Sequence, residues 1–419
     1  MLKRFINVED SERSALLWSF GYFFCLLSSY YVLRPVRDEM GVQIGAQNLP
    51  WFFTATFITM LAAIPLFGWL SARFPRRVLI PSIYLFFIVN ILLFYGAFQF
   101  APSKLWATRI FFVWLSIFNL FAVSVFWSFM VDVFTNEQGK RLFGFIAAGG
   151  TTGAIAGPAL IVSSVELVGV TNMLLFSAAL LAMALVCAIK LGKHSTRSAP
   201  ENHDASGPAV GGGILGGLRA LVISPYLLGI CFYIFCYTVL STLLYVEMAS
   251  MIPQKYADPD KRTEIFAMLD LAVNSLTLLI QLLITAQAFK RLGVMITLSL
   301  LPALAIVGFL VIGVWPLLMV VIVFGVIRRA GEFALSKPAR EILFTVMPRE
   351  AKYKAKNVID TVVYRGGETL SGWLTAILRS AGLELSALAF IAVPIAGLWC
   401  AVSVWLGRHQ QALSASRKE

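Results

Sequence analysis

Polar residues recur at helical spacing within long apolar stretches of this sequence, and they are the first candidates for ligand binding. In one stretch they stand four, three and four positions apart, in the order Asp270, Asn274, Thr277 and Gln281. Residues at such spacings share one face of an α-helix. A charged group in apolar surroundings is costly unless it lines a pathway or has a partner. The spacing therefore predicts a face that borders a polar cavity, with Asp270 and Asn274 as substrate-binding residues.

A second apolar stretch carries a comparable face. Its polar residues are Asn357, Asp360, Thr361, Tyr364 and Glu368, with Arg365 beside them. Of these, Asp360, Tyr364, Arg365 and Glu368 are predicted substrate-binding residues. Burial raises the pKa of a carboxyl and a nearby cation lowers it. The carboxylates Asp270, Asp360 and Glu368 could therefore carry a coupling proton or pair with cations in the empty state.

A third stretch brings basic and acidic residues together. Arg328 and Glu332 are four residues apart, so they can form an ion pair on one helix face. An ion pair that serves as a gate or in packing and a direct substrate contact are both open interpretations. Arg340 and Asp132 complete the predicted gating or ion-pair residues. Asp132 falls at an expected cytoplasmic helix end, where a plain boundary residue is the simpler interpretation.

Two arginines follow the first apolar helix in the stretch SSYYVLRPVRDEMG, residues 28–41. This helix is expected over 15–33, so Arg34 and Arg37 should lie at the membrane boundary. Tyr30, Arg34 and Arg37 share a face until Pro35 disturbs the helix. Long basic side chains often extend to the interface, and this alternative to substrate binding is open.

The composition requires a membrane. The chain has 419 residues, of which 59% are hydrophobic and 13% charged, and its mean hydropathy is +0.81. Soluble domains average roughly 25% charged residues. Stretches of about 20 apolar residues can cross a bilayer, and twelve such spans are predicted at residues 15–33, 51–71, 78–99, 107–131, 143–163, 172–192, 226–246, 264–288, 292–313, 315–334, 358–379 and 385–406.

The spans divide into two predicted halves of six, residues 1–192 and 223–419, which a Gly- and Ser-rich linker at 193–222 joins. Lys and Arg are concentrated in the loops on the side of the N-terminus, so both termini and the linker are expected in the cytoplasm. The same rule accounts for the net charge of +12 without a nucleic-acid partner. The fold class is therefore an all-α membrane protein with twelve transmembrane helices.

Sites for catalysis, ATP hydrolysis or metal binding are not expected. The three histidines, His194, His203 and His409, lie in the predicted linker or tail, which argues against a histidine-based catalytic or metal site in the membrane. No G-x-x-x-x-G-K-[ST] motif is present. The chain is therefore predicted not to be an enzyme and to need no cofactor, and any transport would be driven by an ion gradient or by exchange.

Two motifs resemble the major facilitator superfamily, whose members have six plus six spans and a cytoplasmic middle loop. GWLSARFPRR, residues 68–77, is similar to the basic loop of that superfamily, although Ala72 and Pro75 replace the usual Asp and Gly. GFIAAGGTTGAIAGP, residues 144–158, resembles a Gly/Pro pattern of its antiporters. Small residues four positions apart let helices approach closely, so tight packing is the alternative to an antiport function.

The chain also resembles the ATP/ADP translocase family of nucleotide transporters. The residues that carry the resemblance are 332–372 with the K-x-K-x-x-I-D core at 354–360, SPYLLGI at 224–230, Y-x-L-R-x-x-R-D at 31–38, and 124–150. The resemblance implies that Arg37 and the Lys354/Lys356 region contact nucleotide phosphates from opposite halves. It also shows departures, since the acid that the family has in helix four is absent and Ser241 occupies the region of the acid in helix seven.

These observations predict a secondary active transporter of an anionic small molecule, with a nucleotide or phosphorylated metabolite favoured, working by alternating access with exchange or proton coupling. Arg34, Arg37, Lys354 and Lys356 are its predicted anion contacts. One alternative is a transporter of a neutral or zwitterionic metabolite, drug or lipid in which the charges are gates. Another is a receptor on this fold that does not transport. A monomer in the bacterial inner membrane is expected.

Overall fold

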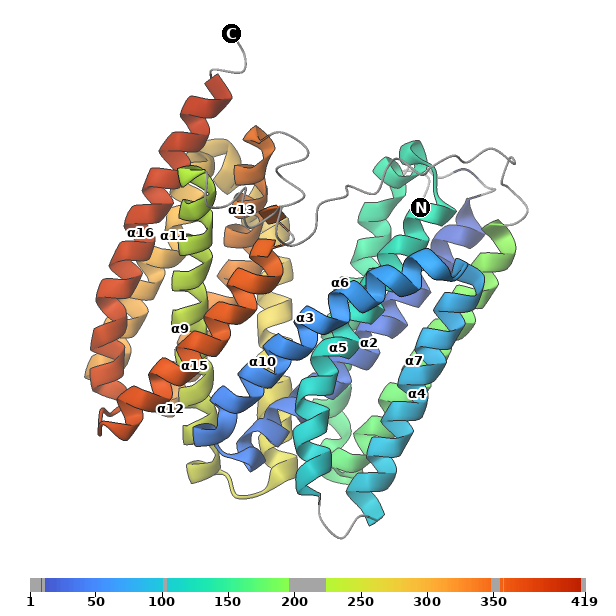
Figure 1. The fold of residues 1–419 in the computed structure, drawn as a ribbon, viewed down its shortest axis with the longest axis horizontal. Helices are drawn as coiled ribbons and strands as arrows, with labels where there is room; N and C mark the ends of the chain where they lie inside the picture. Colours follow the sequence, from blue (N-terminus) through green and yellow to red (C-terminus); the bar gives the residue numbers. More distant parts are fainter. Residues whose placement is uncertain are drawn as a thin grey trace. The chain divides into compact units, whose positions relative to one another are not determined.

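The computed structural model describes residues 9, 12–100, 104–195, 224–347, 355–356 and 358–415. Every regular element in these ranges is helical, as Figure 1 shows. Large apolar side chains such as Leu93 and Phe86 are exposed on the helices, which suits contact with lipid and not with water. The predicted fold class, an all-α membrane protein, is confirmed.

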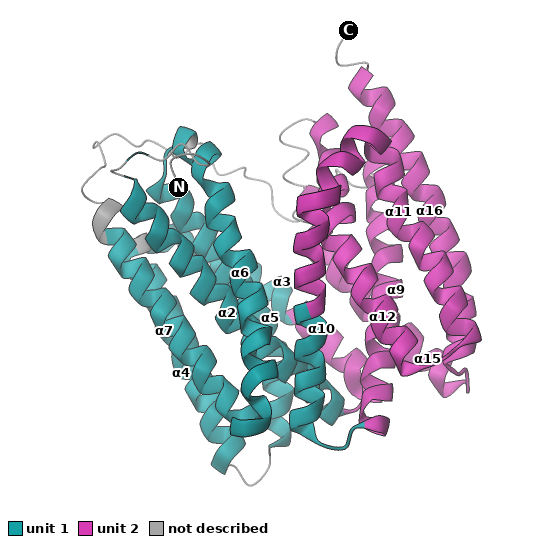
Figure 2. Cartoon of the chain, turned by 180° about the vertical axis from the view of Figure 1, so that it is seen from behind, with its two compact units in different colours: residues 1–44, 59–203, 256–271 teal, residues 45–58, 204–255, 272–419 magenta. Residues whose placement is uncertain are grey.

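The described residues form two compact units, which Figure 2 colours separately. Unit 1 draws on residues 1–44, 59–203 and 256–271, and unit 2 draws on the others. Each unit therefore contains segments from both predicted halves of the sequence. From residue 196 to 222, the predicted linker lies outside the described residues.

Unit 1 is built from long helices. They are α2 (Arg13–Ile44), most of α3 (Leu49–Arg73), α4 (Arg76–Phe100), α5 (Leu105–Val133), α6 (Asn136–Val168), α7 (Val170–Ser195) and the first half of α10 (Pro259–Ile280). Their core is aromatic: Tyr22, Phe118 and Phe126 are fully buried, and the Trp114 and Phe118 rings stack 5.5 Å apart.

Unit 2 combines α-helices with π-helical turns, which contain an extra residue. Its elements are η1 (Ala46–Asn48), the start of α3, α9 (Pro225–Lys255), the end of α10, the π-helical η2 (Gln281–Thr285), α11 (Ala286–Val314), α12 (Leu318–Gly331), the π-helical η3 (Glu332–Ser336), α13 (Lys337–Leu343), η4 (Phe344–Val346), the π-helical η5 (Ile359–Val363), α15 (Tyr364–Ser380) and α16 (Leu385–Ala415). Trp399, Tyr233 and Phe309 are buried in its core. π-Helical turns are rare and are frequent at functional sites.

Nine helical segments in the described ranges are long and apolar enough to cross a membrane. One of them, Pro259–Val314, has 56 residues and covers the predicted eighth and ninth spans. Gly293 breaks it with a φ of 74°. The predicted tenth span, residues 315–334, coincides with α12 and the start of η3, and the predicted eleventh span coincides with η5 and α15. These segments carry charged residues discussed below. The observed segments are consistent with twelve spans.

The first helix does not end where the sequence predicts. α2 continues past Pro35 to Ile44, so Arg34 and Arg37 lie within the helix and not beyond its end. Asp38 and Glu39 are buried in this continuation. The predicted end of the helix at residue 33 is wrong, because Asp38 and Glu39 have partners in the fold and the helix can therefore continue into the protein.

Glycines on α6 let it approach α2 closely. An added Cβ at Gly153 would come 2.4 Å from the carbonyl oxygen of Phe24, and one at Gly157 would come 2.7 Å from that of Ser28. Either distance is shorter than any normal contact, so a side chain would force the helices apart. Residues 144–158 therefore serve tight helix packing in this structure, as their spacing predicts.

Candidate functional site

The first group of predicted residues lies on α2 in unit 1. Arg34 forms an ion pair with Asp270 of α10, with 3.5 Å between Nε and Oδ2. The side chain of Arg34 is 18% exposed and that of Asp270 only 2%. The Arg34 guanidinium also lies over the Tyr31 ring. Two residues of the predicted substrate-binding set, 236 positions apart in the sequence, are thus neighbours.

Arg37 has a different environment from Arg34. Its Nε and Nη2 donate hydrogen bonds to Asp38 over 3.1 and 2.6 Å, and its guanidinium lies over the Phe112 ring of α5. These contacts hold the side chain against the protein, where 20% of it is exposed. Arg37 is thus engaged with its own sequence neighbour, and Arg34 with a distant helix.

A buried ion pair that the sequence analysis did not predict lies one turn further along α2. Arg262, in the first turn of α10, donates to Glu39 from Nε over 2.8 Å and from Nη2 over 2.6 Å. Its Nη1 donates to the carbonyl oxygens of Tyr256 and Ala257. The Glu39 side chain is fully buried. The sequence analysis missed Glu39 because it ended the first helix before this residue.

Two further contacts hold the start of α10 in unit 1. Lys261 forms an ion pair with Glu166 of α6 at 3.0 Å, and a second one within α10 itself with Glu264 at 2.6 Å. Asp260 accepts a hydrogen bond from the backbone N–H of Val170, at the turn between α6 and α7. Charged side chains in the first turn of α10 thus contact α2, α6 and the start of α7.

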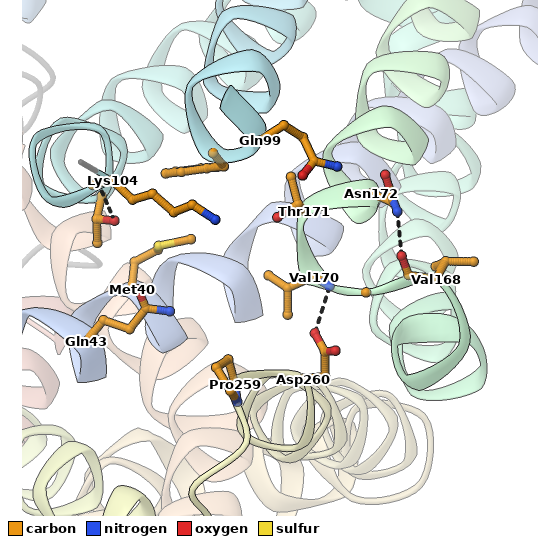
Figure 3. Close-up of a pocket in the computed structure, with 13 residues that line it drawn as sticks. Met40, Gln43, Gln99, Lys104, Val168, Val170, Thr171, Asn172, Pro259 and Asp260 are labelled. Atoms are coloured by element: carbon orange, nitrogen blue, oxygen red, sulfur yellow. Dashed lines mark hydrogen bonds between the residues drawn. The ribbon is translucent and has the colours of Figure 1, made fainter. Parts of the chain in front are cut away.

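A cavity of about 370 Å³ lies beside this attachment. Lys104, Gln43, Gln99 and Asp260 are among its lining residues, and the Lys104 amino group points into it (Figure 3). None of the predicted site residues lines it. This cavity is separate from the Arg34–Asp270 pair, and it does not coincide with the predicted site.

The predicted pair of Arg328 and Glu332 does not form. Arg328 instead donates from Nη2 to the Ser241 hydroxyl of α9 over 3.0 Å, and its guanidinium lies over the Tyr237 ring. Glu332 is closest to Arg340, with 3.7 Å between Oε1 and Nη1. The prediction of this pair is wrong even though the α-helical turn between the two residues is intact, since the backbone N–H of Glu332 donates to the Arg328 carbonyl. Each side chain has another partner instead, Ser241 for Arg328 and Arg340 for Glu332.

The three charged groups of this cluster are buried. Arg328, Glu332 and Arg340 are 3%, 4% and 6% exposed. Several of their polar atoms have no hydrogen-bond partner within the described part of the chain: Nε and Nη1 of Arg328, Oε2 of Glu332 and Nη1 of Arg340. Buried charged groups usually satisfy these atoms. The cluster of Arg328, Glu332 and Arg340 in unit 2 therefore has donor and acceptor atoms that make no hydrogen bond with the described residues.

The second predicted stripe is only partly described. Lys354 and Asn357 lie outside the described residues. Lys356 pairs with Glu341 at 2.5 Å, and Arg365 pairs with Glu368 at 2.9 Å while lying over the Tyr364 ring. Asp360 is exposed and lies in the π-helical η5. The described part of the stripe thus contains one local ion pair, that of Arg365 with Glu368, and the exposed carboxylate of Asp360.

The first stripe is mostly buried, and its role in lining a polar cavity stays a prediction. Asp270, Asn274 and Thr277 are each less than 10% exposed. Gln281 is exposed, and its amide donates to the carbonyl of Phe333 over 3.4 Å. Gln281 begins the π-helical η2, which ends the α-helical spacing of the stripe. Asp132 is exposed near the end of α5, where a boundary residue is expected.

A comparison with models of known protein families identifies the family of this chain. The family model described as Major Facilitator Superfamily matches residues 16–367. The chain belongs to the Major Facilitator Superfamily. It is a multi-pass membrane transporter of the Major Facilitator Superfamily type, and the resemblance that its loop motifs indicate is confirmed.

Curated proteins similar to this chain include ADP,ATP carriers. ADP,ATP carrier protein 1 of Chlamydia trachomatis serovar D is 22% identical over 485 residues, which cover 98% of this chain and 92% of the relative. ADP,ATP carrier protein 1 of Chlamydia muridarum is 22% identical over 496 residues, covering 98% and 91%. The similarity to the ATP/ADP translocase family is thus confirmed across the whole chain.

Solved transporters of the Major Facilitator Superfamily share the fold. The POT family transporter PepTSo matches with a TM-score of 0.67 at 15% identity, covering 95% of this chain and 98% of its own. The nucleoside transporter NupG matches with a TM-score of 0.63 at 14% identity, covering 97% and 99%. At such identities the likeness concerns the fold alone.

Proposed function

We propose that this protein is a secondary active transporter that moves an anionic small molecule by alternating access, with a nucleotide or another phosphorylated metabolite as its substrate. The observation that carries the proposal is the Arg34–Asp270 pair. It joins α2 to α10, which come from different predicted halves of the sequence, through one contact of 3.5 Å. It thus pairs a partly buried cation with a buried carboxylate that a stronger anion can replace.

The geometry of the pair favours exchange of partners. Arg34 meets Asp270 through Nε, whereas a guanidinium binds phosphate or carboxylate best through two parallel hydrogen bonds. An arriving phosphate can form that paired contact and displace Asp270. The freed carboxylate then takes up a proton or finds another cation. An empty carrier restores the ion pair, so that each state of the transport cycle keeps Arg34 neutralised.

The other predicted residues have supporting roles in this proposal. Arg37, Lys354 and Lys356 would contact further phosphate oxygens, and Asn274 and Tyr364 would form polar contacts. Asp360, Arg365 and Glu368 would rearrange with the charge of the substrate, and Asp132, Glu332 and Arg340 would act in gating. Lys356 and Arg365 each have a carboxylate partner within 3 Å, which substrate would have to replace.

The names of the curated relatives support a nucleotide. Two ADP,ATP carriers of Chlamydia species match 98% of this chain, and neither protein's name refers to a neutral substrate. Their bacterial origin supports a location in the bacterial inner membrane. The distribution of Lys and Arg supports cytoplasmic termini, and one chain with two predicted halves around a site supports a monomer.

Counterflow in liposomes tests the proposal. Vesicles containing the purified protein and loaded with unlabelled ADP should accumulate labelled ADP, and Arg34→Gln should reduce this uptake about 10- to 100-fold. The factor follows because a charge-assisted hydrogen bond contributes about 1.5–3 kcal/mol and 1.4 kcal/mol is tenfold. Arg408→Gln, which removes an exposed arginine near the end of α16, is the matched control.

The alternative functions predict other results. If the charges are gates for a neutral or zwitterionic substrate, Arg34→Gln should lower the maximum rate and leave the apparent affinity for that substrate unchanged. A receptor should show no counterflow with any compound. Comparing uptake with and without a pH gradient separates proton coupling from exchange. Absence of uptake for all phosphorylated compounds tested, in protein that transports a neutral one, would refute the proposal.

A further inference from the structure

We infer that Arg328, Ser241 and Tyr237 form an anion subsite within unit 2, which binds a phosphate or carboxylate group of the substrate. This inference rests on the proposed anionic substrate and adds a second contact point to it. The sequence analysis left the role of Arg328 open between a gate and a substrate contact. The geometry of its surroundings favours the contact.

Arg328 is a buried cation with incomplete partners. It is 3% exposed, and Nη2 donates to the neutral Ser241 hydroxyl over 3.0 Å. Its Nε and Nη1 are buried and make no hydrogen bond with the described residues. Among the described residues, no carboxylate forms an ion pair with Arg328. The nearby Glu332 pairs with Arg340 instead.

This arrangement is costly without a ligand. A guanidinium group carries a positive charge and has hydrogen-bond donors only, with no acceptor. A water molecule could accept hydrogen bonds from Nε and Nη1, but it would leave the positive charge uncompensated, and removing a charge from bulk water costs several kcal/mol. An anion supplies both acceptors and the compensating charge. Nε and Nη1 thus identify where one side of the anion would bind.

The neighbouring groups complete the subsite. The Ser241 hydroxyl, which accepts from Nη2, can donate its own proton to an anion oxygen. The Tyr237 ring lies 5.5 Å from the guanidinium carbon and holds it by a cation–π contact. The Tyr364 ring lies 6.2 Å from that of Tyr237. Aromatic faces beside the anion site suit the organic part of a substrate.

The test compares binding of pyrophosphate, ADP and adenosine to the full-length protein in detergent, through the rise in its melting temperature with ligand concentration. Arg328→Met should weaken pyrophosphate and ADP binding at least tenfold and leave any response to adenosine unchanged. Ser241→Asp should have the same effect, because its carboxylate would occupy the position of the ligand. The control is Arg408→Met, which removes an exposed arginine.

Stability without ligand separates a ligand site from a structural role. Because the charge of Arg328 lacks a partner, Arg328→Met should melt no lower than the wild type, and Ser241→Asp should melt higher. Lower melting of both variants, with pyrophosphate affinity unchanged, would overturn the subsite. ADP counterflow that both variants retain at the wild-type rate would also overturn it while the proposed function stands. Wild-type protein that binds neither pyrophosphate nor ADP would refute both.

Discussion

Replacing Glu39 by alanine should destabilise the protein strongly, because it leaves Arg262 with an unbalanced charge. The Glu39 side chain is 0% exposed and that of Arg262 is 10% exposed. Their two hydrogen bonds are 2.6 and 2.8 Å long. Removing one partner of a buried ion pair typically costs about 3–5 kcal/mol. Arg262 keeps the carbonyl oxygens of Tyr256 and Ala257 as acceptors, so we expect the low end, about 3 kcal/mol.

Equilibrium unfolding in mixed micelles measures this free energy. Glu166→Ala is the control, because it removes a partner from the adjacent Lys261 where both side chains are exposed, 41% and 59%. Exposed pairs contribute little, so this change should be much smaller. The double variant Glu39→Met with Arg262→Met should recover most of the lost stability, since an apolar pair can replace a buried ion pair. A cost for Glu39→Ala no larger than that of Glu166→Ala would refute the reasoning.

Two more predictions concern packing and pH. Gly153→Ala should lower the free energy of unfolding by about 1–3 kcal/mol, because the added Cβ would overlap the Phe24 carbonyl. The control is Gly144→Ala, which has open space around it and should leave the free energy of unfolding unchanged. Equal effects of the two changes would contradict the packing argument. Burial by itself raises the pKa of Glu12, but hydrogen bonds from the Glu9 backbone, Gln138 and Arg141 lower it below the ordinary 4.5. Glu12 should therefore stabilise the protein above pH 4.5 and lose this effect as the pH falls through its lowered pKa. The melting difference between wild type and Glu12→Gln should shrink in acid, and a constant difference would contradict this assignment.

Much of the fold follows from the sequence because the bilayer imposes simple requirements. Long apolar stretches predict the helices, and small residues four apart indicate that residues 144–158 can pack closely against another helix, which the structure identifies as α2. The end of the first helix is different. Its continuation to Ile44 depends on partners such as Arg262, which is 223 positions from Glu39, and no local pattern shows that contact.

The sequence predicts which residues belong to the candidate site better than it predicts which of them contact one another. The buried face of Asp270, Asn274 and Thr277 follows from helical spacing. Its contact with Arg34 needed the three-dimensional structure, because each residue has several possible partners of opposite charge. The pairing of Arg328 with Glu332 was predicted from α-helical spacing, which does hold between the two residues. The spacing alone does not show their competing partners, Ser241 and Arg340.

Because of the π-helical turns, the number of residues in each turn sets the direction in which the following side chains of unit 2 point, as much as the residue types set their chemistry. A residue in an α-helix accounts for about 100° of rotation. Deleting one residue within η3 would convert that turn to an α-helix and rotate everything after it, including Arg340, by about that angle. The same holds for η2 and η5. A relative with the same residues but one position fewer at such a turn would present different groups to its ligand, so single-residue insertions and deletions offer a route by which transporters of this kind can change what they bind.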